Sequence, residues 1–236
     1  MSAEAMAGPD PVALGEIAGE MARYFWWHSI DLGNGLVTPG QKSLEIMAEE
    51  FDRTFSPFDL QGKTVLDIGA WNGGFSLEAL RRGARSVTAL DHYTWNEPGF
   101  RGRESFDFVA RVTGANLVAV DIDLDTPALD LTRLGRFDVV LFLGVFYHLK
   151  NPLGVLRQIG EITGEVLVVE THLEHFSQDR PAMLFYPGRE LGGDPTNWWG
   201  PNRACVVELL KMVGFPRVVN ASGWDPNREV FHAYRD

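Results

Sequence analysis

The chain has 236 residues, of which 45% are hydrophobic and 22% are charged, a balance typical of one globular domain with a sizeable core. Its formal net charge is −11 and it has no cluster of lysines and arginines, which disfavours a nucleic-acid partner. The single cysteine, Cys205, excludes an internal disulfide and fits a cytoplasmic protein. No apolar run approaches the length of a membrane span, so no membrane partner is expected.

Residues 1–60 are expected to form a cap of helices on the rest of the chain. One helix is predicted from Pro11 to Phe25, and a second begins at the capping box Thr38-Pro-Gly-Gln41. The aromatic stretch between them contains Trp27 and His28. These two side chains either pack the first helix onto the main domain or face a substrate, and the sequence leaves both interpretations open.

The stretch Thr64-Val-Leu-Asp-Ile-Gly-Ala-Trp-Asn-Gly-Gly74 organises the chain. A short buried strand is followed by a glycine-rich turn and then by apolar residues at helical spacing from Phe75 to Arg82. An open α/β sheet binds nucleotide-like ligands at such a strand, turn and helix. Trp71 stands where the dinucleotide fingerprint has its second glycine. A bound pyrophosphate would collide with that side chain, whereas a nucleoside without phosphates would not.

Further strands follow in chain order. Ser86 to Asp91 is the next one, and Asp91 lies about 20 residues beyond the turn, the spacing at which an acid meets ribose hydroxyls. The third, fourth and fifth strands are predicted at Asn116–Val120, Phe137–Leu143 and Glu165–Glu170. The fourth is apolar throughout and is expected to be buried on both faces.

In the segment from about 171 to 200 the apolar residues show neither helical nor strand periodicity. A segment this long in a compact domain is usually functional, and we expect a lid. A helix is predicted from Asn202 to Val213. The chain then closes with an antiparallel hairpin formed by Arg217–Ala221 and Glu229–Tyr234.

The turn, Asp91 and seven strands in this order resemble the class I S-adenosylmethionine-dependent methyltransferases, over roughly Gly62 to the C-terminus. The usual turn of that family is Asp-x-Gly-x-Gly-x-Gly, and here its middle glycine is Trp71. The resemblance implies an α/β, Rossmann-like methyltransferase domain over residues 61–236, with a seven-stranded, mostly parallel sheet and a C-terminal antiparallel hairpin. It also implies S-adenosyl-L-methionine as the cofactor. The residues expected to bind the cofactor are Asp67, Gly69, Trp71, Asn72, Gly73, Asp91, His92, Asp121, Ile122, Leu143 and Gly144.

Shorter motifs resemble one subgroup, which includes the tRNA wobble-uridine carboxymethyltransferases that use carboxy-S-adenosylmethionine. These motifs are His28-Ser-Ile-Asp31, Gly35-x-x-Thr-Pro-Gly40, Leu143-Gly-Val-Phe-Tyr-His148 and Asn151-Pro152. In the tRNA enzymes a tyrosine at the place of Tyr147 and an arginine near the C-terminus, matched here by Arg228, help to hold the extra carboxylate. The family's lysine before the Ile-Asp turn has no counterpart here. That difference and the acidic charge favour ordinary S-adenosylmethionine and a small-molecule acceptor.

Methyl transfer from a sulfonium is an in-line displacement that requires alignment of the acceptor and exclusion of water. An acceptor that bears a proton also needs a base. The candidate catalytic residues follow the fourth and fifth strands and are Tyr147, His148, Glu170 and His172. The candidates for binding the acceptor are Trp27, His28, Tyr186, Arg189, Trp198, Trp199 and Arg228. The spacing of Glu170, His172, Glu174 and His175 fits no standard metal site, so no metal is expected.

Several functions therefore stay open. The favoured one is a methyltransferase acting on O, N or C of a small molecule. The alternatives are a tRNA-modifying enzyme and a non-catalytic cofactor-binding protein, while Trp71 argues against a nicotinamide dehydrogenase. The sequence does not identify the acceptor, distinguish plain from carboxylated cofactor or give the oligomeric state.

Overall fold

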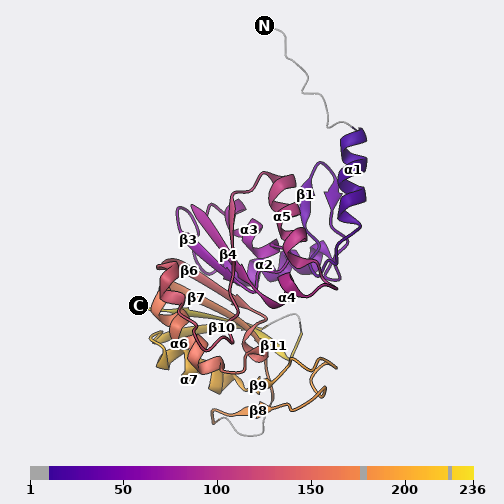
Figure 1. The fold of residues 1–236 in the computed structure, drawn as a ribbon. Helices are drawn as coiled ribbons and strands as arrows, with labels where there is room; N and C mark the ends of the chain where they lie inside the picture. Colours follow the sequence, from indigo (N-terminus) through magenta and orange to yellow (C-terminus); the bar gives the residue numbers. More distant parts are fainter. Residues whose placement is uncertain (1–10, 176–179, 223–224) are drawn as a thin grey trace.

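A computed structural model describes residues 11–175, 180–222 and 225–236 of the chain. Seven strands form one sheet in the order β10-β11-β7-β6-β3-β4-β5 (Figure 1). The five strands from β7 to β5 are parallel, and β11 runs antiparallel to both of its neighbours. The predicted α/β sheet, mostly parallel with a C-terminal antiparallel hairpin, is thus confirmed.

The strands follow the predicted segments closely. The parallel ones are β3 (Thr64–Ile68), β4 (Ser86–Asp91), β5 (Leu117–Asp121), β6 (Phe137–Leu143) and β7 (Thr163–His172). The closing hairpin consists of β10 (Arg217–Ser222) and β11 (Arg228–Tyr234). Asp91 is the register partner of Asp121, and Leu143 that of Glu170. The register therefore aligns the candidate site residues along one edge of the sheet.

Helices cover both faces of the sheet. One face carries α2 (Leu44–Phe55), α3 (Gly74–Arg81) and α5 (Gly102–Thr113), and the other carries η1 (Leu131–Leu134), α6 (Pro152–Ile162) and α7 (Arg203–Met212). Alternate residues of β6 point to opposite faces, so Leu141 packs with α2 and α3 while Phe142 packs with α6 and α7. Both side chains are fully buried, as expected for a central strand. Two short helices, α4 (Tyr93–Asn96) and η2 (Phe146–His148), follow β4 and β6.

Two asparagines cap helices in the second half of the chain. Asn151 caps α6 by accepting the Gly154 N–H at 3.0 Å, with Pro152 in the first turn. Asn202 caps α7 by accepting the Cys205 N–H at 2.9 Å. These caps fix where each helix begins.

The N-terminal region differs from its prediction. Helix α1 (Pro11–Met21) ends before Phe25, and α2 begins at Leu44 with Ser43 as its N-cap. The prediction that Thr38-Pro-Gly-Gln41 is a capping box that begins this helix is therefore wrong. The Thr38 hydroxyl instead accepts the Ile30 N–H at 2.8 Å and donates to the His28 carbonyl at 2.9 Å, inside a small hairpin. That hairpin consists of β1 (Asp31–Gly33) and β2 (Leu36–Val37).

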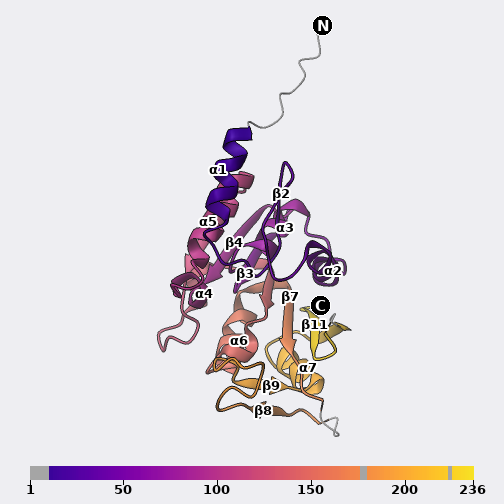
Figure 2. The same cartoon turned by 90° about the vertical axis from the view of Figure 1, so that its right-hand side faces the viewer.

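The N-terminal segment packs on the outside of two helices. Trp26, Ile30 and Leu32 are buried against Leu77 of α3 and Phe108 of α5. Two views at right angles place α1 beside α5, at the end of the molecule away from β8 and β9 (Figures 1 and 2). The aromatic residues after α1 are thereby held beside the glycine-rich turn.

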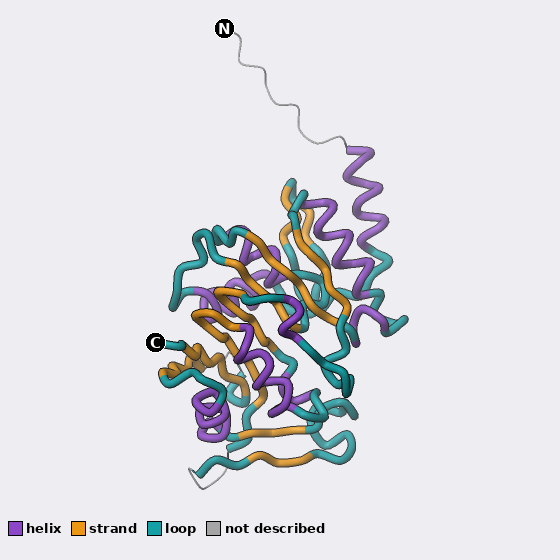
Figure 3. Tube along the Cα trace, turned by 60° about the vertical axis from the view of Figure 1, so that its left-hand side comes forward, coloured by secondary structure: helices purple, strands orange, loops and turns teal. Residues whose placement is uncertain are grey.

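The segment from 171 to 200 carries a hairpin of its own. Strand β8 (Met183–Phe185) pairs antiparallel with β9 (Trp199–Pro201), separate from the main sheet (Figure 3). Residues 176–179 of this segment lie outside the described residues, as do residues 1–10 of the predicted cap. Within the described ranges, every helix is too short or too polar to cross a lipid bilayer.

Candidate active site

Three glycines shape the carboxyl edge of the sheet. Gly69 ends β3, Gly73 precedes α3 and Gly144 follows β6, and all three have φ between 71° and 84°. A β-carbon on Gly69 would lie 2.3 Å from the Val145 side chain. The backbone after β3 can therefore approach the segment after β6 only because residue 69 is glycine.

Asp91 joins the glycine-rich turn to the end of β4. Its Oδ2 accepts the Trp71 N–H at 3.0 Å, and its Oδ1 accepts the Thr94 N–H at 3.1 Å. The carboxyl is buried, and burial raises its pKa. The Thr94 side chain and the His92 backbone also form hydrogen bonds that favour its charged form. Asp91 thus holds the turn in place, and its carboxylate is the type of acceptor that a ribose diol needs.

Asp67 braces the same turn from within the sheet. It accepts the Ser76 hydroxyl of α3 at 2.6 Å and is almost completely buried. Burial, reinforced by the charge of Asp91, raises the pKa of Asp67 to about 6 from an ordinary 3.8. Its side chain connects strand to helix, so its contribution to a ligand site is to position the turn.

The stability of the protein should therefore depend on Asp67. Its folded pKa lies above the unfolded value, so its stabilising effect is complete below pH 3.8 and is lost as the pH rises through about 6. The gap between the two values corresponds to about 3 kcal/mol. Between about pH 5 and about pH 8, the unfolding free energy of the wild-type protein should fall by about 1–2 kcal/mol more than that of Asp67→Asn. Urea denaturation at the two pH values measures the difference. Identical pH profiles for the two proteins would contradict this.

The ends of β4 and β5 form a polar cluster. Asp121 accepts from Asn96 Nδ2 at 2.9 Å and pairs with His92 Nδ1 at 2.7 Å. The side chains of His92 and Asp121 are each 45% exposed, so both are accessible to a ligand. The Ile122 N–H donates to the Asp91 carbonyl at 3.2 Å, which brings the two strand ends together.

Trp71 lies within an aromatic stack. Its ring stacks on Trp27 with centroids 5.7 Å apart and 3° between planes, and on Phe25 at 5.8 Å. Trp71 has φ 45°, a left-handed conformation that is uncommon for a bulky residue. Asn72 is fully buried beneath the stack, where it accepts the Trp27 N–H at 3.2 Å and donates to the Phe25 carbonyl. The N-terminal segment and the turn therefore form one unit, and the Asn72 side chain is engaged within it.

His28 packs edge-on against Phe75 of α3, with ring centroids 5.7 Å apart. Its ring is buried, and its Nδ1 has no hydrogen-bond partner among the described residues. Burial, with the charge of Lys42 as a second cause, lowers its pKa to about 3, so the ring is neutral at physiological pH. Lys42 itself pairs with Glu50 at 2.7 Å.

An ion pair occupies the edge of the sheet beyond Gly144. Arg228 donates to Glu170 through Nε at 2.6 Å and Nη2 at 2.8 Å, and Nη2 also reaches the Tyr147 hydroxyl at 3.1 Å. A β-carbon on Gly144 would lie 3.6–3.7 Å from all three polar groups. The three predicted residues thus converge above the end of β6.

The segment 171–200 is bonded to the chain that follows β6. The Trp198 N–H donates to the Tyr147 carbonyl at 2.8 Å, and Trp199 Nε1 donates to the Leu149 carbonyl at 2.7 Å. His148 Nδ1 lies 2.9 Å from the Thr196 hydroxyl, and burial lowers the pKa of this histidine.

A second polar chain joins the end of β7 to β8. His172 Nε2 lies 2.9 Å from Glu174 Oε1, which also accepts the Tyr186 hydroxyl. Arg189 is not part of this group: it is exposed and donates to the Gly193 carbonyl within its own loop. Glu174, Thr196 and Ser76 were not predicted as site residues, and of their contacts here only that of Thr196 with His148 joins distant parts of the chain. Among the described residues, no group of histidine, cysteine and carboxylate side chains could hold a metal.

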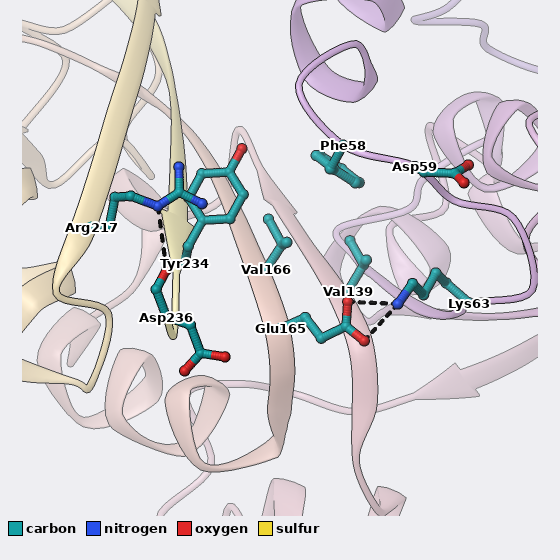
Figure 4. Close-up of a pocket in the computed structure, with 9 residues that line it drawn as sticks. All are labelled: Phe58, Asp59, Lys63, Val139, Glu165, Val166, Arg217, Tyr234 and Asp236. Carbon is teal, nitrogen blue, oxygen red and sulfur yellow. Dashed lines mark hydrogen bonds and ion pairs between the residues drawn. The ribbon is translucent and has the colours of Figure 1, made fainter.

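A separate cavity of about 380 Å³ opens at the amino ends of β6 and β7 (Figure 4). Its walls include the Lys63–Glu165 ion pair and Arg217, whose guanidinium lies 3.6 Å from the centre of the Tyr234 ring. It lies at the opposite edge of the sheet from the glycine-rich turn, so it belongs to no part of the candidate active site.

The fold and the turn define a class I S-adenosylmethionine-dependent methyltransferase. Residues 42–210 match the family model described as a methyltransferase domain, and the chain belongs to that family. The buried acid at the end of β4, the close approach at Gly69 and the exposed acceptors of Asp121 fit a nucleoside cofactor.

Among curated proteins, the tRNA U34 carboxymethyltransferase of Desulforapulum autotrophicum is 37% identical over 163 residues, which are 67% of this chain and 46% of that protein. The enzyme of the same name from Dichelobacter nodosus is 31% identical over 161 residues, or 67% and 47% of the two chains. The chain therefore spans about half the length of the curated relatives it matches.

Solved structures share the fold. The N-terminal domain of EvdMO1 with S-adenosylhomocysteine bound has a TM-score of 0.66 at 20% identity, covering 96% of this chain and 97% of that one. Magnesium protoporphyrin IX methyltransferase (ChlM) from Synechocystis PCC 6803, also with S-adenosylhomocysteine, has a TM-score of 0.58 at 14% identity, covering 81% and 83%. S-adenosylhomocysteine is what S-adenosylmethionine becomes after methyl transfer.

Proposed function

We propose that this chain methylates a small molecule bound between Gly144 and the segment 171–200, which acts as a lid. The observation that carries the proposal is the set of hydrogen bonds between this segment and residues 147–149. They hold the segment beside the end of β6, next to the expected cofactor position. A covered site of this kind excludes water and favours a compact acceptor over a polymer.

The proposed cofactor site follows the strand ends. Asp91 would accept the ribose hydroxyls, while His92, Asp121 and Ile122 would border the adenine. Gly69, Leu143 and Gly144 would line the approach to the sulfur, with Trp71 forming part of the wall. When bound, S-adenosylmethionine supplies an electrophilic methyl group on a sulfonium.

The proposed acceptor side contains two polar groups. Arg228, Glu170 and Tyr147 form one, which would position the acceptor by hydrogen bonding. His172, oriented by Glu174, belongs to the other and is the candidate base for an acceptor that loses a proton. His148 is the second candidate base, with Nδ1 oriented by Thr196.

A second candidate function is modification of tRNA. It is favoured by the names of the sequence relatives, tRNA U34 carboxymethyltransferases. The charge of −11 opposes a large phosphate-binding surface. The two functions are separated by measuring S-adenosylhomocysteine release with a protein-free metabolite extract and with unmodified tRNA, each with plain and carboxylated cofactor. The proposal expects release with the extract and plain cofactor, and release with tRNA alone would overturn it.

The lid can be tested by a matched pair of tryptophan variants. Trp199→Phe removes the hydrogen bond to Leu149 in the lid, and Trp95→Phe removes a bond of similar length, 2.8 Å, to the Trp71 carbonyl in the turn. One hydrogen bond contributes about 0.5–1.5 kcal/mol, so we expect a roughly three- to tenfold change in each case. Trp199→Phe should raise the acceptor KM, and Trp95→Phe should weaken cofactor affinity. If Trp199→Phe weakens cofactor affinity instead, the segment is not a lid over the acceptor.

A further inference from the structure

The hydroxyl of Tyr147 is buried beside the end of β6. The residue is only 9% exposed, and its oxygen accepts a hydrogen bond from Arg228 Nη2 at 3.1 Å. Among the described residues, no acceptor is recorded for the phenolic proton, although a phenol can donate one hydrogen bond while it accepts another. A β-carbon on Gly144 would lie 3.6 Å from this oxygen. An unused donor therefore borders the space above Gly144.

The charges beside this hydroxyl cancel each other. Glu170 accepts two hydrogen bonds from Arg228, through Nε at 2.6 Å and Nη2 at 2.8 Å. The pair therefore offers an anionic acceptor no unpaired cation. A cationic acceptor would meet Arg228, because a β-carbon on Gly144 would lie 3.7 Å from Arg228 Nη2. An uncharged molecule is the acceptor that fits this ion pair without breaking it.

A second polar group lies directly beside the first. Arg228 and His172 are register partners across β11 and β7, so their side chains stand on the same face of the sheet. His172 Nε2 lies 2.9 Å from Glu174 Oε1, which also accepts the Tyr186 hydroxyl. A neutral His172 that donates from Nε2 keeps Nδ1 as a proton acceptor. The two groups can thus act on two adjacent polar atoms of one molecule.

We propose that the acceptor is an uncharged molecule with neighbouring hydroxyl groups, one of which is methylated on oxygen. One hydroxyl would accept a hydrogen bond from Tyr147 and donate one to Glu170, and its neighbour would lie at His172. A hydroxyl both donates and accepts, which matches a lining that combines a free donor with carboxylate oxygens. The inference rests on the proposed function and names the class of its small-molecule acceptor.

Methyl transfer to such a hydroxyl releases one proton. The hydroxyl oxygen forms a bond to the methyl carbon as the carbon–sulfur bond breaks, and the electron pair of that bond stays on sulfur. The sulfonium thereby becomes the neutral thioether of S-adenosylhomocysteine, and the hydroxyl proton passes to His172. Glu174 stabilises the imidazolium through its hydrogen bond at Nε2.

A protein-free metabolite extract separated by charge tests the acceptor class. The extract is passed through anion- and cation-exchange resins, and part of the unretained fraction is treated with periodate, which cleaves the bond between neighbouring hydroxyl-bearing carbons. Excess periodate is reduced with sulfite, and a control portion receives periodate that was reduced beforehand. S-adenosylhomocysteine release is then measured with plain S-adenosylmethionine. We expect release with the unretained fraction and its loss after periodate treatment.

A matched pair of tyrosine variants tests the contact itself. Tyr147→Phe removes the free donor without changing charge, so it should raise the amount of the unretained fraction needed for half-maximal rate about three- to tenfold. Its affinity for S-adenosylhomocysteine should stay within about twofold of wild type. Tyr24→Phe is the control, because the Tyr24 hydroxyl bonds Glu20 of α1 at 3.0 Å. Both quantities should match wild type in that variant.

Release confined to a retained, charged fraction would overturn the inference, as would release that survives periodate. A Tyr147→Phe protein with unchanged half-saturation, or one that loses cofactor affinity equally, would overturn it too. In each of these cases methylation of a small molecule still stands. No release with the untreated extract would instead contradict the proposed function, and this inference with it.

Discussion

Replacing Glu170 with alanine is expected to lower the free energy of unfolding by about 2–4 kcal/mol, because it leaves the Arg228 guanidinium partly buried without its carboxylate. The side chains of the pair are only 20–24% exposed, and both Arg228 bonds to Glu170 are shorter than 2.9 Å. The magnitude lies below that of a fully buried pair because some water reaches these groups. Urea denaturation of the purified variant measures it.

The double variant Glu170→Ala/Arg228→Ala is the control for this prediction. It removes both charges together, so it should be more stable than Glu170→Ala alone, although the side-chain volume that is lost is larger. The exposed Lys211→Ala, which breaks a pair with Glu208 on the surface of α7, should change stability by less than about 1 kcal/mol. A Glu170→Ala variant as stable as wild type would show that the pair has no structural role.

Asp91→Ala is expected to weaken binding of S-adenosylhomocysteine by about 1.5–3 kcal/mol, or roughly ten- to 150-fold. The change removes the proposed ribose acceptors and leaves the Trp71 and Thr94 amides without a partner. Both effects act on the turn that holds the cofactor, so affinity should fall more than stability does. Isothermal titration calorimetry measures the affinity.

The matched control for Asp91 is Asp107→Ala. Asp107 is an exposed carboxylate on α5 that pairs with Arg103, and its loss should leave affinity unchanged. Asp91→Asn retains one oxygen acceptor, so its affinity for S-adenosylhomocysteine should lie between those of Asp91→Ala and Asp107→Ala. Normal affinity in a folded Asp91→Ala protein would remove this residue from the cofactor site.

The sheet was predictable from the sequence because its signals are local. Apolar runs of strand length, glycines at Gly69 and Gly114, and the caps Asn151 and Asn202 mark where elements begin and end. The end of the first N-terminal helix and the start of the second were predicted wrongly, because tertiary contacts outweighed local ones there. The hydroxyl of Thr38 bonds Ile30 and His28 across a hairpin, which no helical pattern reveals.

The candidate site was predictable only in part. Strand-end residues such as Asp91 and Asp121 follow from the order of the strands. The pairing of Arg228 with Glu170 depends on the register of β11 on β7, which residue types alone do not specify. The contact of Glu174 with Tyr186 depends in turn on how the segment after β7 folds back.

The decisive measurement is a crystal structure of the protein grown with S-adenosylhomocysteine. We expect ribose hydroxyls at Asp91 and a sulfur that faces the space between Gly144 and the segment 171–200. That segment should remain bonded to Leu149 through Trp199. A ligand bound elsewhere, or a sulfur that faces open solvent with no covering segment, would contradict a methyltransferase acting on a small enclosed acceptor.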